Sequence, residues 1–138
     1  DGAVLVGSAG VTTDNDPSRS SKGQMLALRV NASGEVIWQR RYGGRGADGG
    51  TGIAALESGG SLIAGGSWPG HGPYASMAAW ALTDSGDRVW STEFGRPVEL
   101  GWGQGVASRD GYAVVVGGLK EYGDPTQFNI VVARYRVD

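Results

Sequence analysis

Short apolar runs, separated by clusters of Gly, Asn, Asp and Ser, cover most of this chain. The most regular stretch predicts four strands, at residues 52–57, 61–65, 77–82 and 88–94. None of the runs has the 3.6-residue apolar period of an amphipathic helix with recognisable caps. The pattern therefore predicts an all-β protein with many tight turns.

The apolar runs recur along the chain. The letters AVLVG at residues 3–7 match SLIAG at 61–65 and AVVVG at 113–117, at offsets of 58 and 52 residues. A second segment, SGEVIW at 33–38, matches SGDRVW at 85–90. Matches of this kind on both sides of connections of unequal length indicate an internal repeat. We infer that one four-stranded unit, with strands a to d in chain order, occurs nearly three times.

Consecutive four-stranded antiparallel units of this length are typical of β-propeller blades. Strands b and c are then expected to be covered on both faces by neighbouring blades, which would explain the continuous apolar runs at 114–116 and 130–132. Trp38 and Trp90 hold equivalent places in strand d, and we expect each ring to be buried between blades.

The repeat predicts ten strands where three complete blades need twelve, in an incomplete ring of about two and a half blades. The predicted division is a partial b–c–d blade at 1–44, a complete blade at 45–95 and a partial a–b–c blade at 96–138. Propellers close with about four to eight blades, so these residues are too few to close a ring. Three explanations stay open: a segment of a longer propeller, pairing with itself or another subunit, or a compact β-sheet domain of another kind. Uncovered faces and open strand edges would be adhesive.

Three segments carry a resemblance to a known family. GYAVVVG at 111–117 resembles strand b of bacterial β-propeller repeats of the delta-60 and seven-bladed-propeller types. SGEVIWQRRYGG at 33–44 resembles their c–d hairpin, and VARY at 132–135 resembles the delta-60 strand c. The Ser-Gly-x-x-x-Trp spacing is also similar to the tryptophan-docking turn of quinoprotein propellers. The resemblance implies a propeller fold and an extracellular or periplasmic location. It implies no cofactor, because the arginine, carboxylate and vicinal-cysteine set of quinoprotein dehydrogenases is missing.

The amino-acid composition excludes several kinds of functional site. The chain has no cysteine and one histidine, which excludes disulfides, thiolate metal sites and a cysteine nucleophile. A net charge of −2 argues against a general nucleic-acid binder. No apolar run approaches the ~20 residues that span a bilayer. The 26 glycines fit a β-protein with many turns that need positive φ.

Candidate binding residues lie in the longer connections, where binding groups are most often found. One connection contains Trp68, His71 and Tyr74, a combination in which an aromatic ring stacks on a sugar face and the imidazole donates a hydrogen bond. Trp102 and Tyr122 are expected in neighbouring connections and would join the same surface. The alternative for each of these aromatic side chains is packing on the sheet.

The acidic residues suggest two weaker sites. Asp14 and Asp16 could bind a hard cation such as calcium, although an EF-hand pattern is absent and an ordinary turn explains them equally well. Asp48 and Glu99, both expected in connections, would form a hydrolytic pair only if they faced one cleft. The alternative is that both are solvated surface acids. No nucleophile elbow or P-loop occurs.

Together these observations favour a non-catalytic β-propeller module, without a cofactor, that mediates protein association or scaffolding. Its partner would be a second copy or another protein subunit. Two alternatives are kept: a carbohydrate-binding, lectin-like propeller, and a fragment of a larger propeller enzyme whose catalytic residues lie elsewhere.

Overall fold

The structure is a computed structural model. It describes residues 2–9, 23–43, 46–68, 75–95, 99–121, 123–124 and 126–137. These residues form ten β-strands and no helix, so the prediction of an all-β protein is confirmed. No long apolar helix of the kind that crosses a bilayer occurs among them.

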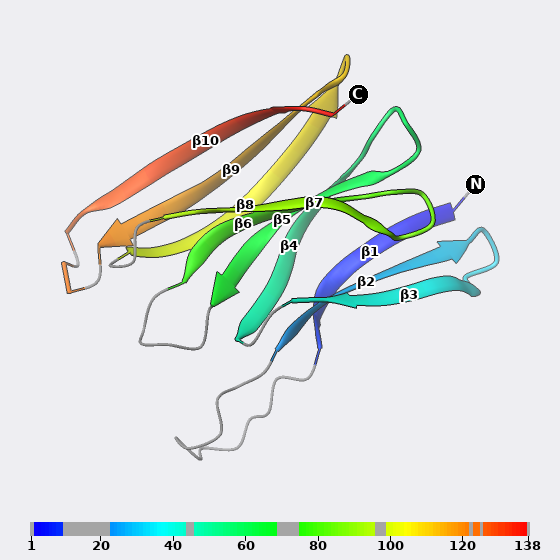
Figure 1. The fold of residues 1–138 in the computed structure, drawn as a ribbon, viewed down its shortest axis with the longest axis horizontal. Helices are drawn as coiled ribbons and strands as arrows, with labels where there is room; N and C mark the ends of the chain where they lie inside the picture. Colours follow the sequence, from blue (N-terminus) through cyan, green and yellow to red (C-terminus); the bar gives the residue numbers. More distant parts are fainter. Residues whose placement is uncertain are drawn as a thin grey trace.

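The strands of the described residues form three antiparallel sheets (Figure 1). The first sheet contains β1 (Gly2–Ala9), β2 (Gln24–Asn31) and β3 (Val36–Tyr42). The middle sheet contains β4 (Ala47–Ala55), β5 (Ser61–Trp68), β6 (Ser76–Leu82) and β7 (Arg88–Phe94). The third sheet contains β8 (Glu99–Arg109), β9 (Tyr112–Glu121) and β10 (Phe128–Arg136). Neighbouring strands pair in chain order, so each sheet is a meander.

The three sheets share local details that recur along the sequence. The matching runs at 3–7, 61–65 and 113–117 lie in β1, β5 and β9, each in a different sheet. The register shifts between Arg29 and Val30 where β2 pairs with β3, and 52 residues later it shifts between Ala81 and Leu82 where β6 pairs with β7. The first and middle sheets thus share a bulge at the same spacing along the sequence.

The turns after β2 and β6 are also copies of each other. The amide of Gly34 donates to the carbonyl of Asn31, and the amide of Gly86 donates to the carbonyl of Thr83. The φ angles of Gly34 and Gly86 are +83° and +82°, a left-handed conformation that glycine adopts without steric cost. This requirement explains why the Ser-Gly pair recurs 52 residues later.

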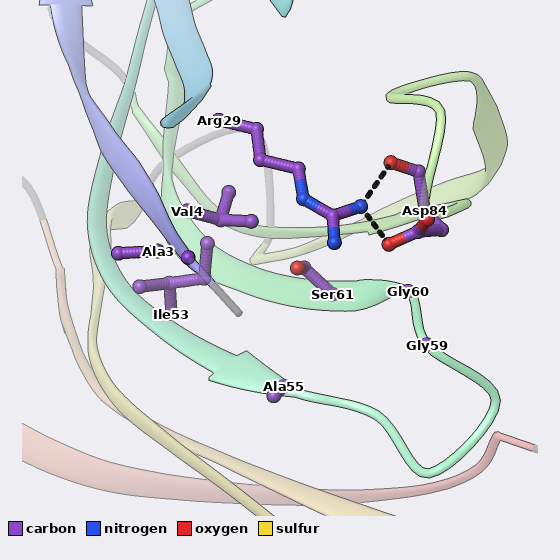
Figure 2. A pocket seen from close by; sticks show the side chains of 10 residues that line it. Ala3, Val4, Arg29, Ile53, Ala55, Gly59, Gly60, Ser61 and Asp84 are labelled. Carbon is purple, nitrogen blue, oxygen red and sulfur yellow. Dashed lines mark hydrogen bonds and ion pairs between the residues drawn. The ribbon is translucent and has the colours of Figure 1, made fainter. Parts of the chain in front are cut away.

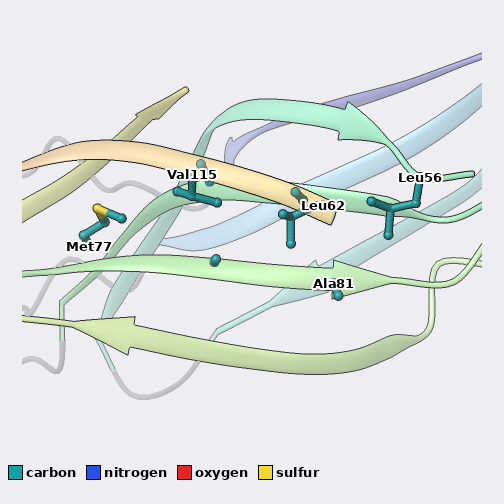
Figure 3. Packing of buried hydrophobic residues seen from close by; sticks show 8 residues of the cluster. Leu56, Leu62, Met77, Ala81 and Val115 are labelled. Carbon is teal, nitrogen blue, oxygen red and sulfur yellow. The ribbon is translucent and has the colours of Figure 1, made fainter. Parts of the chain in front are cut away.

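The middle sheet lies between the other two and is covered on both faces. One core cluster joins it to the first sheet, around Met25, Trp38 and Ile63. The other joins it to the third sheet, with Leu62, Met77 and Val115 pointing between the sheets (Figure 3). Burial of these side chains supplies the main stabilisation, because a single four-stranded sheet cannot bury both of its faces alone.

Backbone contacts at the two seams repeat as well. The amide of Asp48 in β4 donates to the carbonyl of Gly23, just before β2, at 2.9 Å. At the equivalent place in the next seam, the amide of Gly101 in β8 donates to the carbonyl of Ala75, just before β6. The first strand of a sheet is therefore tied to the sheet before it by the same hydrogen bond in both seams.

Candidate interaction surfaces

Each sheet has two faces, which can be followed through the repeat by strand register. We call one the leading face. Its members are Val4, Val6, Met25 and Ala27 in the first sheet, Leu62, Ala64, Met77 and Ala79 in the middle sheet, and Val114, Val116, Ile130 and Val132 in the third sheet. We call the opposite side the trailing face. Its members are Leu5, Leu26, Leu28 and Val30 in the first sheet, Ile63, Ala78, Trp80 and Leu82 in the middle sheet, and Val115, Val131, Ala133 and Tyr135 in the third sheet.

The two seams of the structure follow one rule. The leading face of the first sheet packs on the trailing face of the middle sheet. The leading face of the middle sheet packs on the trailing face of the third sheet. Both seams thus bring together equivalent surfaces in the same orientation. The members named above are all apolar, and Arg29 and Arg134 also lie on the leading faces of the first and third sheets.

The turn after β6 anchors the seam between the first and middle sheets. The indole Nε1 of Trp38 donates to the carbonyl of Asp84 at 2.9 Å, and the ring lies against Gly86. The hydroxyl of Tyr42 donates to the carbonyl of Gly86. Trp38 is only 9% exposed, so its ring is buried between two sheets.

Trp90 holds the equivalent place in the second seam but is less enclosed. It is partly buried, and its ring centroid lies 5.0 Å from that of Tyr135. Phe94 also approaches Tyr135, at 6.1 Å between ring centroids. The second seam therefore uses aromatic packing where the first uses a tryptophan docked on a turn.

Burial perturbs two tyrosines at these seams. Burial raises the pKa of Tyr42, the nearby Arg40 lowers it, and Asp87 raises it further. Burial raises the pKa of Tyr135 to about 12. The Tyr135 hydroxyl is buried and has no hydrogen-bond partner among the described residues. These shifts follow from packing and identify no acid–base catalyst.

A pocket of about 350 Å³ opens at the end of the first seam (Figure 2). In Figure 2, Arg29 reaches from β2 toward Asp84, and its guanidinium donates to the side chain and the backbone carbonyl of Asp84. Small apolar residues such as Ala3, Val4 and Ile53 line much of the remaining wall. The two charges pair with each other across the seam, which makes this ion pair a structural contact between sheets.

The structure places the predicted ligand-binding aromatics differently from what was expected. Trp102 lies inside strand β8 rather than in a connection, and its ring covers Gly66 of β5, where a side chain would collide with it. Trp68 is the last residue of β5 and is partly buried. His71, Tyr74 and Tyr122 lie outside the described residues.

The acidic candidates do not form a site in the described part of the chain. Asp48 is buried in strand β4, and Glu99 is the first residue of β8. The prediction that both lie in connections between strands is therefore wrong. Asp14 and Asp16 lie outside the described residues. Within the described ranges, no group of three or more acidic or histidine side chains could hold a metal ion.

Trp102 does line a second pocket, of about 340 Å³, on the outer side of the third sheet. Phe128 lies against Gly118 and forms an aromatic wall of this pocket, while Gln104 and Lys120 supply polar groups. Aromatic rings beside a few hydrogen-bonding groups are typical of small-ligand sites.

The leading face of the third sheet is an uncovered apolar surface among the described residues. Ile130 and Val132 are 81% and 63% exposed, whereas Met77 and Ala79, their equivalents in the middle sheet, are 0% exposed. The prediction that strands b and c are covered on both faces holds for β5 and β6 but is wrong for β9 and β10. The reason is position: the described residues contain no sheet beyond the third.

The trailing face of the first sheet is also uncovered by the described residues. Leu5 is 49% exposed, whereas Ile63, its equivalent in the middle sheet, is 0% exposed. Leu26, Leu28 and Val30 beside it are only partly buried. The residues of these two end faces were not among the predicted binding residues, although the spacing of the matching apolar runs identifies them.

Comparison with known proteins adds no assignment, since the sequence matches no family model and none of the curated proteins.

Proposed function

We propose that this chain is a non-catalytic segment of a β-propeller that functions in protein association. Its three sheets are successive blades, and its two end faces are contact surfaces for further sheets. The observation that carries the proposal is the exposure of Ile130 and Val132 at positions where the middle sheet is completely buried. Contiguous exposed apolar surface of this kind is characteristic of interaction sites.

The repeated seams support a propeller arrangement. In a propeller, successive four-stranded sheets pack face to face around an axis, with the first strand of each sheet innermost. Here the first strands β4 and β8 contact each other, and β4 also contacts β1 of the preceding sheet. Identical seams of this kind, continued in the same direction, generate further blades rather than a closed two-layer sandwich.

A measurement of mass in solution tests the association function. Light scattering coupled to size-exclusion chromatography should give a mass above the 14.2 kDa of one chain, and the mass should rise with protein concentration. Ile130→Lys should lower that mass, because a lysine charge on the face opposes its burial. A folded monomer that stays at 14.2 kDa at high concentration would contradict the proposal.

The pocket beside Trp102 favours a second candidate function, carbohydrate binding. A sugar ring could stack on Trp102, with hydrogen bonds from Gln104 and Lys120. A glycan array should then show binding that Trp102→Ala abolishes and that Val89→Ala, at an exposed site on the middle sheet, leaves unchanged. The pocket shares the outer side of the third sheet with the leading face, so a sheet docked there would cover it. Absence of any glycan signal would eliminate this candidate.

A further inference from the structure

We propose that the partner of the uncovered faces is a second copy of this chain, bound head to tail. The leading face of the third sheet of one copy packs on the trailing face of the first sheet of the other. This partner assignment rests on the association function proposed above and makes it specific. The assignment specifies the partner molecule, the two faces in contact and their order.

The chain already contains this type of contact twice. Leading face meets trailing face between the first and middle sheets, and again between the middle and third sheets. The two uncovered end faces are one of each type. A second copy therefore offers each end face the kind of surface that the same face meets inside the molecule.

The side chains of the two faces also suit such a contact. The third sheet presents the β-branched side chains Val116, Ile130 and Val132, and the first sheet presents Leu5 and Leu28, together with other aliphatic residues. These side chains are of medium size and can interdigitate. By register the same faces also carry Arg134 on the third sheet and Arg41 on the first, so the contact has to leave these charges solvated or paired.

An arginine holds the same register position in the first and third sheets, although the middle sheet has Ala81 there. Arg134 in β10 occupies the position that Arg29 holds in β2, opposite Val114 and Val4 respectively. In the first seam, Arg29 binds the turn that follows β6 of the next sheet. In the single chain the Arg134 guanidinium lies over the Tyr112 ring. In the head-to-tail contact it would face the equivalent turn after β2, where Ala32 replaces Asp84 and the exposed carboxylate is that of Glu35, which accepts a hydrogen bond from Asn31.

Symmetry then limits the assembly. A head-to-tail contact either closes into a ring or continues into a filament. Two copies of the three described sheets make six, which is within the range of about four to eight blades in closed propellers. We therefore expect a closed dimer in which both end faces of each copy are covered.

The test uses two complementary variants of the full chain. Ile130→Lys places a charge on the leading face, and Leu5→Lys places one on the trailing face. Both side chains are exposed in the single chain, so both variants should fold. Far-UV circular dichroism will check that they do. Analytical ultracentrifugation should give a mass of twice 14.2 kDa for the unmodified chain, the mass of a dimer. Each variant alone should have the monomer mass of 14.2 kDa. Val89→Lys, at an exposed valine outside both faces, is the matched control and should remain dimeric.

Mixing the two variants distinguishes the geometries. In a head-to-tail dimer, an equimolar mixture regains a mass of twice 14.2 kDa, because the intact leading face of one variant meets the intact trailing face of the other. If leading faces bind each other, Leu5→Lys stays dimeric alone and mixing with Ile130→Lys restores nothing. That outcome, or a dimer that survives both substitutions, would overturn the head-to-tail assignment and leave the association function standing. An unmodified chain that stays monomeric would overturn both.

Discussion

The leading faces of the middle and third sheets are built to the same plan, yet only one is covered. Met77 and Ile130 are equivalent in the repeat, as are Ala79 and Val132, and the exposed fraction changes from 0% in the middle sheet to 81% and 63% in the third. Strand register and side-chain direction are the same in both sheets. What differs is the presence of a neighbouring sheet, so burial in a stacked repeat depends on a residue's place in the stack as well as on its type.

A charge placed at equivalent positions of the two faces should give the largest difference in stability loss. Ala79→Asp buries a carboxylate in a core cluster, where no partner compensates it, and should lower the free energy of unfolding by about 4–5 kcal/mol. Val132→Asp, on the exposed face, should cost about 1 kcal/mol through lost strand propensity. Urea denaturation, at a concentration where the protein is monomeric, compares the two. Equal losses would show that the third sheet's leading face is covered within one chain.

Truncation at the trailing faces should give the next largest difference. Ile63→Ala leaves a cavity at a fully buried site and should cost about 3 kcal/mol, while Leu5→Ala at the equivalent exposed site should cost less than about 1 kcal/mol. The same urea experiment measures both. In a dimeric sample the cost of Leu5→Ala should increase, because the head-to-tail contact would bury that side chain.

Much of the fold follows from local pattern, and these examples show why. β7 spans the predicted residues 88–94, because a run bounded by turn residues leaves little freedom. β4 was predicted at 52–57 but begins at Ala47, since Gly49 and Gly50 resemble a loop in sequence. In the structure a side chain at Gly50 would collide with Val6 and Ile63, so the glycines permit a close approach of strands. Such approaches are long-range properties that local propensity does not contain.

The interaction surfaces were harder to predict than the strands. The run at 114–116 is continuously apolar, but Val115 is fully buried while Val116 is 38% exposed. Sequence pattern places both in a strand and does not say whether a further sheet follows. The docking of Trp38 on Asp84 joins residues 46 positions apart, and only the three-dimensional stack brings them together. The repeat predicted a tryptophan between sheets but not the carbonyl that it binds.

Substitution of the two equivalent tryptophans should give a smaller difference in stability loss. Trp38→Phe removes the hydrogen bond to the Asp84 carbonyl and part of the contact with Gly86, which should cost about 1–2 kcal/mol. Trp90→Phe keeps an aromatic ring beside Tyr135 and should cost less than about 1 kcal/mol. Thermal unfolding followed by circular dichroism will rank them. A larger loss for Trp90→Phe would mean that the second seam depends on its tryptophan more than the first does.

The smallest expected effect has opposite signs at the two seams. Tyr42→Phe removes a hydroxyl that donates to the Gly86 carbonyl and should lower the free energy of unfolding by about 1 kcal/mol. Tyr135→Phe removes a buried hydroxyl without a partner among the described residues and should raise it by about 1 kcal/mol. Urea denaturation of both variants at neutral pH measures the pair. A loss at both sites would mean that the Tyr135 hydroxyl is hydrogen-bonded in solution.

Alkaline titration provides the independent check on Tyr135. Its pKa is about 12 in the folded chain, against an ordinary value of 10.0, so the unfolded chain loses this proton first. The stability that depends on a protonated Tyr135 is fully present below pH 10 and is lost as the pH rises from 10 to 12. The free energy of unfolding of the unmodified chain therefore falls across that window. Tyr135→Phe should lose less stability over the same range, and because all other tyrosines are shared, the difference between the two proteins isolates this residue. Parallel pH profiles would show that the hydroxyl is solvated, and that the second seam is more open than the first.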